Sequence, residues 1–266
     1  MKKSLFPLCV CLALTACQPN LPAQQTSQEN TMPVANEITP TTTSENTAQE
    51  TYSIPIELAY TDEHDKEYIQ NKMLLLSKFY PIGWGKNGEF AYIEEPADEA
   101  CGCYFFEIHI ADKNGQELWS WRYDSGDESE PMQANLDNTW AKNQDLFTEK
   151  LKEYGIVQQT SWTITPIEFD DNGKHLAVSS TIQKGTHDLL GYDDVVKTTD
   201  FYLHQNGEKK NIFTQKHEMV ILSDELIGVL RHPSEKRAVV VSKINIHGYE
   251  GPPTVLSFYL VGFEWD

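Results

Sequence analysis

Cys101 and Cys103 are separated by a single residue, a spacing that suggests chemistry. In an oxidising compartment these thiols can form a disulfide with each other or with another molecule. A bridge over so short a loop restrains the unfolded chain by about 1.6 kcal/mol, so it would shape a turn rather than support the fold. The alternative is a redox-active pair, although thiol–disulfide enzymes usually carry Cys-x-x-Cys at the amino terminus of a helix.

Acidic side chains gather in two segments. The first group lies in an expected exposed loop and consists of Asp124, Asp127, Glu128 and Glu130. The second group consists of Glu94, Glu95, Asp98 and Glu99. Calcium accepts irregular loops of oxygen ligands, so both groups are calcium candidates, although neither has the spacing of an EF-hand. Paired carboxylates could also serve a glycosidase. We expect solvated loop charge at both groups and no resident metal.

The eight histidines show no catalytic or zinc-binding spacing. None pairs with a second histidine four residues away across a glutamate, as a zinc protease would require. His109 and His204 lie in alternating, strand-like segments, where the expected position of a polar side chain is the solvent face. A nucleophile elbow, a phosphate loop and a dinucleotide fingerprint are also missing from the sequence. The sequence therefore predicts no catalytic residue and no cofactor.

The loop 248–253 contains the sequence Gly-Tyr-Glu-Gly-Pro-Pro. Glycine permits positive φ angles and proline fixes its own φ, so the pattern predicts a rigid turn. The alternative is a recognition loop that presents Tyr249 and Glu250 to a partner. The segment resembles the Gly-Phe-Glu-Gly-Pro end of a family of predicted secreted bacterial proteins of unknown function, with Tyr249 in place of the phenylalanine. That resemblance implies no activity.

The amino terminus has the features of a secretion signal. Two lysines precede an apolar stretch at 5–13, which is shorter than the roughly 20 residues of a membrane-spanning helix. The sequence Leu-Thr-Ala-Cys at 14–17 resembles the lipobox of bacterial lipoproteins. The resemblance implies cleavage after residues 1–16 and acylation (diacylglyceryl and palmitate-type chains) at Cys17. Gln18 follows, where an aspartate would resemble an inner-membrane retention signal, so the resemblance favours the outer membrane. The alternative is an ordinary cleaved signal that ends at Ala16.

Residues 17–50 have the composition of a tether. Residues 18–50 contain no lysine, arginine, glycine or aromatic residue and are rich in Thr, Gln and Pro. Such a segment cannot bury enough apolar surface to offset its ordering entropy, so the sequence predicts disorder. Its average span is roughly 30 Å, and it reaches about 110 Å when extended.

The chain is strongly acidic, with a formal net charge of −19. Removal of residues 1–16 takes away two lysines and leaves a net charge of −21. A negative surface repels phosphate backbones and anionic headgroups, so we expect no nucleic-acid partner and no membrane contact apart from the lipid anchor.

The sequence of the predicted domain, 51–266, is typical of a mainly β fold. Four Asn-Gly dipeptides, which favour tight hairpin turns, begin at positions 87, 114, 172 and 206. In the segment 104–110 apolar residues alternate with polar ones. Three hairpin-like segments, 84–93, 169–178 and 232–241, share a loose pattern, and apolar strands are expected before them at 73–80, 162–167, 219–222 and 226–230. The aromatic-x-x-Asn-Gly-x-x-Ala pattern resembles the repeat of TolB-type β-propellers. We expect antiparallel β-meanders in a propeller-like or an open, sandwich-like arrangement.

A helical insertion, 124–159, interrupts the strands. Asp137 or Asn138 can cap an amphipathic helix over about 137–154, and Gly155 stands at its expected end. Its apolar stripe consists of Trp140, Phe147, Leu151 and Tyr154.

These features together favour an outer-membrane lipoprotein that binds a protein or another envelope component without catalysis. It would face the periplasm or the cell surface. The alternatives are an envelope hydrolase or thiol-redox protein and a structural spacer without a specific ligand.

Overall fold

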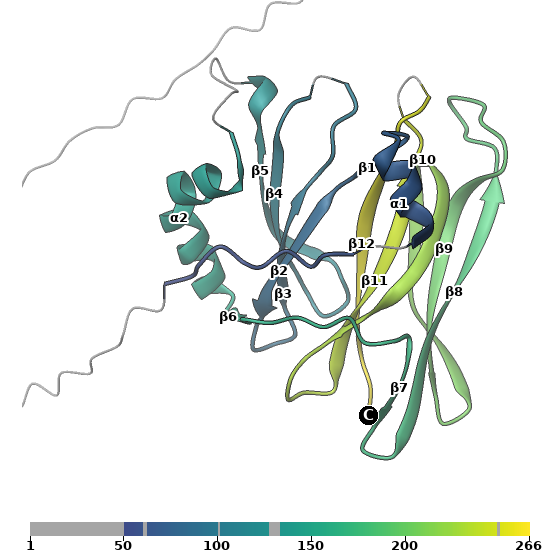
Figure 1. Ribbon diagram of the computed structural model, residues 1–266. Coiled ribbons are helices and arrows are strands. Elements are labelled where there is room, and N and C mark those ends of the chain that lie inside the picture. The colour runs from purple at the N-terminus through teal and green to yellow at the C-terminus, as the bar shows by residue number, and fades with distance from the viewer. Residues whose placement is uncertain (1–50, 61–62, 101, 128–133, 249–250) are drawn as a thin grey trace, which may run out of the picture. The chain divides into compact units, whose positions relative to one another are not determined.

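The computed structural model describes residues 51–60, 63–100, 102–127, 134–248 and 251–266, and these described residues form one compact unit (Figure 1). This unit contains two β-sheets and one long helix. The predicted mainly β class with an inserted helix is confirmed. Within the described residues, no helix has both the length and the apolar character needed to cross a bilayer.

The smaller sheet is antiparallel and has five strands. Its strands are β2 (Lys78–Trp84), β3 (Phe90–Glu95), β4 (Phe105–Ala111), β5 (Glu117–Asp124) and β6 (Val157–Gln158). Their order across the sheet is β5-β4-β3-β2-β6. Between β5 and β6 the chain forms a 3-10 turn (Ser125–Asp127) and the helix α2 (Leu136–Glu153).

The larger sheet has seven strands and is curled. Its strands are β1 (Leu74–Leu76), β7 (Glu168–Asp171), β8 (Lys174–Gly185), β9 (Val195–Gln205), β10 (Glu208–Arg231), β11 (Arg237–Ile246) and β12 (Thr254–Glu264). The order is β1-β12-β11-β10-β9-β8-β7, and β1 runs parallel to β12. The first half of β10 pairs with β9 and the second half with β11, with register shifts in both ladders. Such shifts bend a strand and increase its twist, which explains the curl in Figure 1.

Helix α2 covers one face of the five-stranded sheet. Along β4, Phe106, Ile108 and Ile110 are buried in alternation, as the sequence pattern predicts, and Phe106 stacks on Phe147 of α2 at 5.6 Å. This core holds the helix against the sheet (Figure 1). The other face of the same sheet packs on the seven-stranded sheet through a second core that includes Phe79, Phe90 and Val241. The packed, sandwich-like arrangement is therefore the one that forms.

The concave side of the curled sheet is filled by side chains. A third core there includes Phe201, Val240 and Phe263. A buried polar network lies on the same side of the sheet. In it the Asp224 carboxylate accepts hydrogen bonds from the hydroxyls of Thr199 (2.6 Å) and Ser242. The described side chains on this side of the curled sheet are therefore packed against one another.

Helix α2 matches its prediction at one end and differs at the other. The side chain of Asn135, not Asp137 or Asn138, caps the helix by accepting a 2.9 Å hydrogen bond from the Asn138 backbone N–H. The cap lies earlier because Leu136 already has helical geometry. At the other end Gly155 adopts φ +62°, so its predicted role in ending the helix is confirmed.

The three hairpin-like segments all form hairpins, β2–β3, β7–β8 and β10–β11. The prediction of a strand at 162–167 was wrong. This segment makes a single isolated β-bridge, between Thr165 and Val229. Pro166 has no backbone N–H and cannot continue a ladder, which explains the failure. The segment 159–165 instead crosses from the smaller to the larger sheet. Its ends are held by hydrogen bonds from Gln159 N to Ile82 O (2.8 Å) and from Thr165 N to Val229 O (2.9 Å).

Candidate functional site

An open hollow of about 410 Å³ lies between the segment 159–165 and the turn that follows β10. Half of the eight lining residues carry hydroxyl or amide side chains, namely Gln159, Ser161, Thr163 and Thr165. The remaining lining comes from Trp162, Arg231, His232 and Pro233. No acidic side chain is among these residues. The volume falls within the roughly 300–1,000 Å³ of small-molecule sites, and the lining is polar.

Arg231 is held in place on two sides. Its Nη2 lies 2.7 Å from Asp171 Oδ1, and its guanidinium carbon lies 4.7 Å from the centre of the Phe169 ring. Asp171 also accepts a 3.0 Å hydrogen bond from Trp265 Nε1, and together with the Arg231 charge this bond lowers the pKa of Asp171. The guanidinium is therefore fixed at the hollow before any ligand arrives, and its side chain stays 30% exposed.

His232 is a neutral donor at the hollow. Its Nδ1 accepts hydrogen bonds from the backbone N–H groups of Ser234 (3.2 Å) and Glu235 (2.9 Å), so the ring proton lies on Nε2. Burial lowers the pKa of His232, and the charge of Arg237 lowers it further. The ring packs edge-on against Trp84, with 5.4 Å between ring centres.

Unpartnered donors concentrate around this hollow. Among the described residues, six buried side-chain nitrogen or oxygen atoms have no hydrogen-bond partner. Four of the six are N–H donors of Trp84, Trp162, Arg231 and Arg237, which we call the donor cluster. Trp84 lies near two of the other members, since its ring centre is 6.5 Å from that of Trp162 and 5.6 Å from the Arg237 guanidinium carbon. Each unpartnered buried donor costs about 1–3 kcal/mol, and two of the four belong to residues that line the hollow, Trp162 and Arg231.

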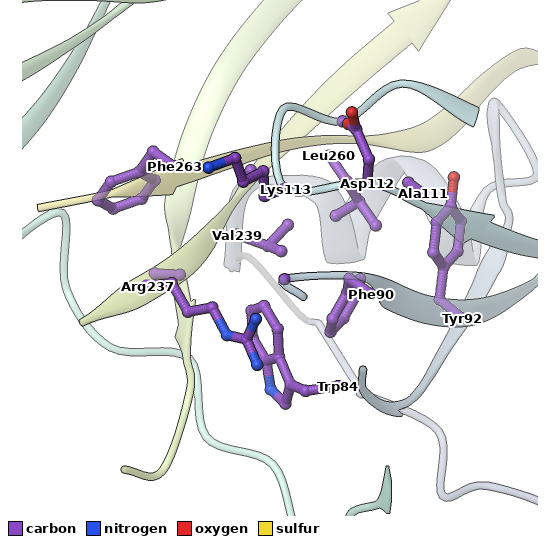
Figure 2. Close-up of a pocket in the computed structure, with 14 residues that line it drawn as sticks. Trp84, Phe90, Tyr92, Ala111, Asp112, Lys113, Arg237, Val239, Leu260 and Phe263 are labelled. Atoms are coloured by element: carbon purple, nitrogen blue, oxygen red, sulfur yellow. The ribbon is translucent and has the colours of Figure 1, made fainter. Parts of the chain in front are cut away.

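A second cavity lies between the two sheets. Its lining includes Trp84, whose ring contacts His232 of the hollow. Figure 2 shows the Arg237 guanidinium against the Trp84 indole, with Phe90 and Val239 nearby. The volume of this cavity is about 30 Å³, close to that of one water molecule. Arg237 donates a 2.6 Å hydrogen bond to Gly85 O and is nearly fully buried. This cavity is a packing feature and cannot accept an organic ligand.

A carboxylate cluster occupies the face of the five-stranded sheet that packs on β12. Glu94 and Glu107 lie opposite each other on β3 and β4, and His109 contacts Glu107 (3.3 Å) and Glu117 (3.0 Å). Burial raises the pKa of Glu94 to about 7, whereas the hydrogen bond from His109 lowers the pKa of Glu107. Divergent pKa values can mark an acid and a base. Here, however, the Glu94 carboxylate already has a partner, because it accepts a hydrogen bond from the Ser257 hydroxyl of β12.

The predicted solvent-facing position of His109 was wrong. Its side chain is only 17% exposed and stacks on Tyr92 with 4.9 Å between ring centres. Two acceptor carboxylates and an aromatic neighbour make this inward position favourable. His204 is also half-buried, with Nε2 2.7 Å from Ser179 Oγ.

Most of the predicted site residues fall outside the described part of the chain. Cys17, Cys101, Tyr249, Glu250, Glu128 and Glu130 all lie there, so lipidation, the disulfide and the recognition loop stay predictions. Cys103 N donates a 2.9 Å hydrogen bond to Asp98 Oδ2. Asp124 Oδ1 accepts a 2.8 Å hydrogen bond from Gly126 N, which is a local turn contact. Within the described residues, no group of three or more His, Cys, Asp or Glu side chains could hold a metal.

The residues of the hollow carried no signal in the sequence. Trp162 and Arg231 are 69 positions apart in the numbering, and neither belongs to a spaced motif. The one available hint was Pro166, which marks the end of a segment that cannot pair as a strand.

Comparison with known proteins does not add a function. No family model matches the chain, and neither a curated protein nor a solved structure matches it. The hollow is therefore interpreted from its own chemistry.

Proposed function

We propose that this chain is a non-catalytic binding module of the cell envelope that holds a small hydroxyl-rich ligand, of about monosaccharide size, in the hollow. The observation that carries the proposal is the lining of the hollow. Four hydroxyl or amide side chains, one indole ring and two nitrogen donors meet there in a volume of about 410 Å³.

The chemistry of the lining supports a polar ligand. Hydroxyl and amide groups both donate and accept hydrogen bonds, so they match the alternating pattern of a sugar's hydroxyls. The half-buried Trp162 offers an apolar ring surface, and a sugar ring has apolar C–H faces. The packed interior of the curled sheet argues against an apolar ligand.

The same lining supports binding over catalysis. Among the residues that line the hollow, the candidate for a general base is His232. Its Nδ1, however, already accepts two backbone hydrogen bonds. A general base must reach the proton that it abstracts. The proposal therefore assigns orientation and affinity to these residues rather than a chemical step.

The location in the proposal comes from the lipobox resemblance at 14–17 and from the composition of the tether. Acyl chains at Cys17 would hold the protein at the outer membrane, since two or more chains anchor stably where one does not. The tether would let the domain reach an envelope component some distance from the bilayer.

Titration calorimetry of the full chain in detergent, with glucose and glucuronate as probes, tests the proposal. We expect at least one of these sugars to bind in the millimolar range or tighter. Thr163→Trp should abolish binding because the indole fills the hollow, whereas Thr181→Trp, at an exposed position on β8, should not. If neither sugar binds, or if Thr163→Trp binds normally, the proposal is wrong.

A further inference from the structure

We infer that the ligand of the hollow carries an anionic oxygen group, a carboxylate or a phosphate, which Arg231 and His232 recognise. The inference rests on the proposed function, because it names the chemistry of the ligand in the same hollow.

The acidic side chains around the hollow already have partners. Asp171 accepts from Arg231 through Oδ1 and from Trp265 through Oδ2. Glu235, beside His232, lies 3.2 Å from Arg237 Nη2. Neither carboxylate belongs to the lining of the hollow. A ligand with a protonated amine would therefore find no anionic partner there.

The donors, in contrast, exceed the acceptors. The Arg231 side chain is 30% exposed at the hollow, and its guanidinium has more N–H donors than the one that contacts Asp171. His232 carries its ring proton on Nε2, which lies 3.7 Å from Glu235 Oε1, beyond hydrogen-bond distance. A hydroxyl group brings its own donor and so does not correct this excess. A carboxylate or phosphate oxygen only accepts, and hydrogen bonds to such a charged oxygen are about twice as strong as neutral ones.

The position of Arg231 suits this role. Its planar guanidinium matches the geometry of carboxylate and phosphate oxygens. The ion pair with Asp171 and the contact with the Phe169 ring hold the side chain in one orientation. Binding then costs little side-chain entropy, because the group is ordered in advance. The adjacent His232 adds a neutral donor whose tautomer is set by the backbone.

Three sugars that differ at one carbon test the inference by calorimetry of the full chain. Glucose is neutral, glucuronate carries a carboxylate, and glucose 6-phosphate carries a phosphate. We expect one or both anionic sugars to bind about tenfold tighter than glucose, because charge-assisted hydrogen bonds replace neutral ones. The tighter of the two identifies the oxyanion. The affinity for the anionic sugar should also fall as salt is added, whereas that for glucose should not.

Arg231→Gln should remove the anion preference, so that the anionic sugars bind no more tightly than glucose does. The matched control is Arg122→Gln, because this arginine is 59% exposed on β5 and pairs with Glu107. The control should keep the preference. If Arg231→Gln fails to fold, the salt dependence of the unaltered chain decides the question.

The outcomes separate the two proposals. Equal affinity for the three sugars, or an anion preference that survives Arg231→Gln, overturns this inference and leaves the proposed function standing. Absence of binding by all three sugars overturns both.

Discussion

Lys243 Nζ on β11 lies 2.8 Å from Asp65 Oδ2 on α1 (Glu63–Gln70), and the two side chains are only 7% and 12% exposed. The contact joins a short helix to a central strand of the seven-stranded sheet. Burial lowers the pKa of Lys243, but the hydrogen bond to Asp65 and the nearby carboxylates outweigh it and raise this pKa above its ordinary value.

Asp65→Asn should lower the free energy of unfolding by about 1–3 kcal/mol, because it leaves a buried ammonium without its nearest anion. Glu225 remains 3.4 Å from Lys243 Nζ but is 58% exposed, so it compensates in part. Guanidinium denaturation measures the change. The control is Asp194→Asn, which breaks the exposed Lys184–Asp194 pair and should cost well under 1 kcal/mol, as exposed pairs contribute about 0–1 kcal/mol. Equal losses in the two variants would contradict this prediction.

The stability of the fold should fall as the pH rises through the range in which Glu94 ionises. Burial raises the pKa of Glu94 from 4.5 to about 7, so the folded state binds a proton that the unfolded state has released. Stability from this group is complete below pH 4.5 and is lost as the pH rises to about 7. Burial lowers the pKa of His109, but Glu107 and Glu117 outweigh it and raise the value, so stability is again lost with rising pH.

Denaturation at several pH values measures this loss, whose slope for one proton approaches about 1.4 kcal/mol per pH unit. Glu94→Gln should flatten the slope below pH 7, since glutamine does not titrate. Glu153→Gln, at a position 52% exposed on α2, should leave it unchanged. A slope that persists in Glu94→Gln would show that another group is responsible.

Gly228→Ala should displace one wall of the hollow. An added Cβ at this position would lie 2.3 Å from Ile164 Cγ2 and 2.6 Å from Thr165 O, so the segment 159–165 must move away from β10. Overpacking of this kind costs about 1–3 kcal/mol, and we expect sugar binding to weaken as well. Gly185→Ala is the control, because its new Cβ would meet only the flexible Lys197 side chain, at 3.3 Å. Calorimetry with the sugar probes checks both variants, and unchanged affinity in Gly228→Ala would argue against the hollow.

Cys17→Ser should release the protein from the membrane fraction of expressing bacteria. The hydroxyl cannot form the thioether, and each acyl CH₂ lost from the bilayer removes about 0.8 kcal/mol of anchoring. Mass spectrometry of the unaltered chain should show cleavage before Cys17 together with the mass of the acyl chains. The double replacement of Cys101 and Cys103 by serine is the control and should stay with the membrane. A soluble, unacylated mature protein would refute the anchor.

The local signals in the sequence were sufficient for the tight turns and for the carboxyl-terminal end of α2. Asn172 and Gly173 both have positive φ, as do Asn206 and Gly207, which is the geometry that Asn-Gly turns predict. At positions 87 and 114 only the glycine of the pair does so. These signals are local because a turn or a helix stop depends on the φ angles that a single residue permits.

The larger features depend on distant contacts and could not be predicted from spacing. The apolar runs at 219–222 and 226–230 were expected before the third hairpin-like segment, and both belong to β10, but the length of that strand (Glu208–Arg231) was not predicted. Register shifts within β10 interrupt the alternation by which one long strand would be recognised. The hollow was missed for a related reason. Its two walls meet because the segment 159–165 crosses between the sheets, and no periodic pattern encodes that crossing.

The pairing of β1 with β12 has a consequence for the order of folding. Among the described residues, 74–76 have their ladder partners at 254–256, which follow them by 180 positions. Because synthesis starts at the amino terminus, β1 must wait until these later residues have emerged before it can enter the sheet. Contacts of such long sequence separation slow folding. A nascent or truncated chain that lacks its last strand would therefore expose two unpaired edges at once, β1 and β11.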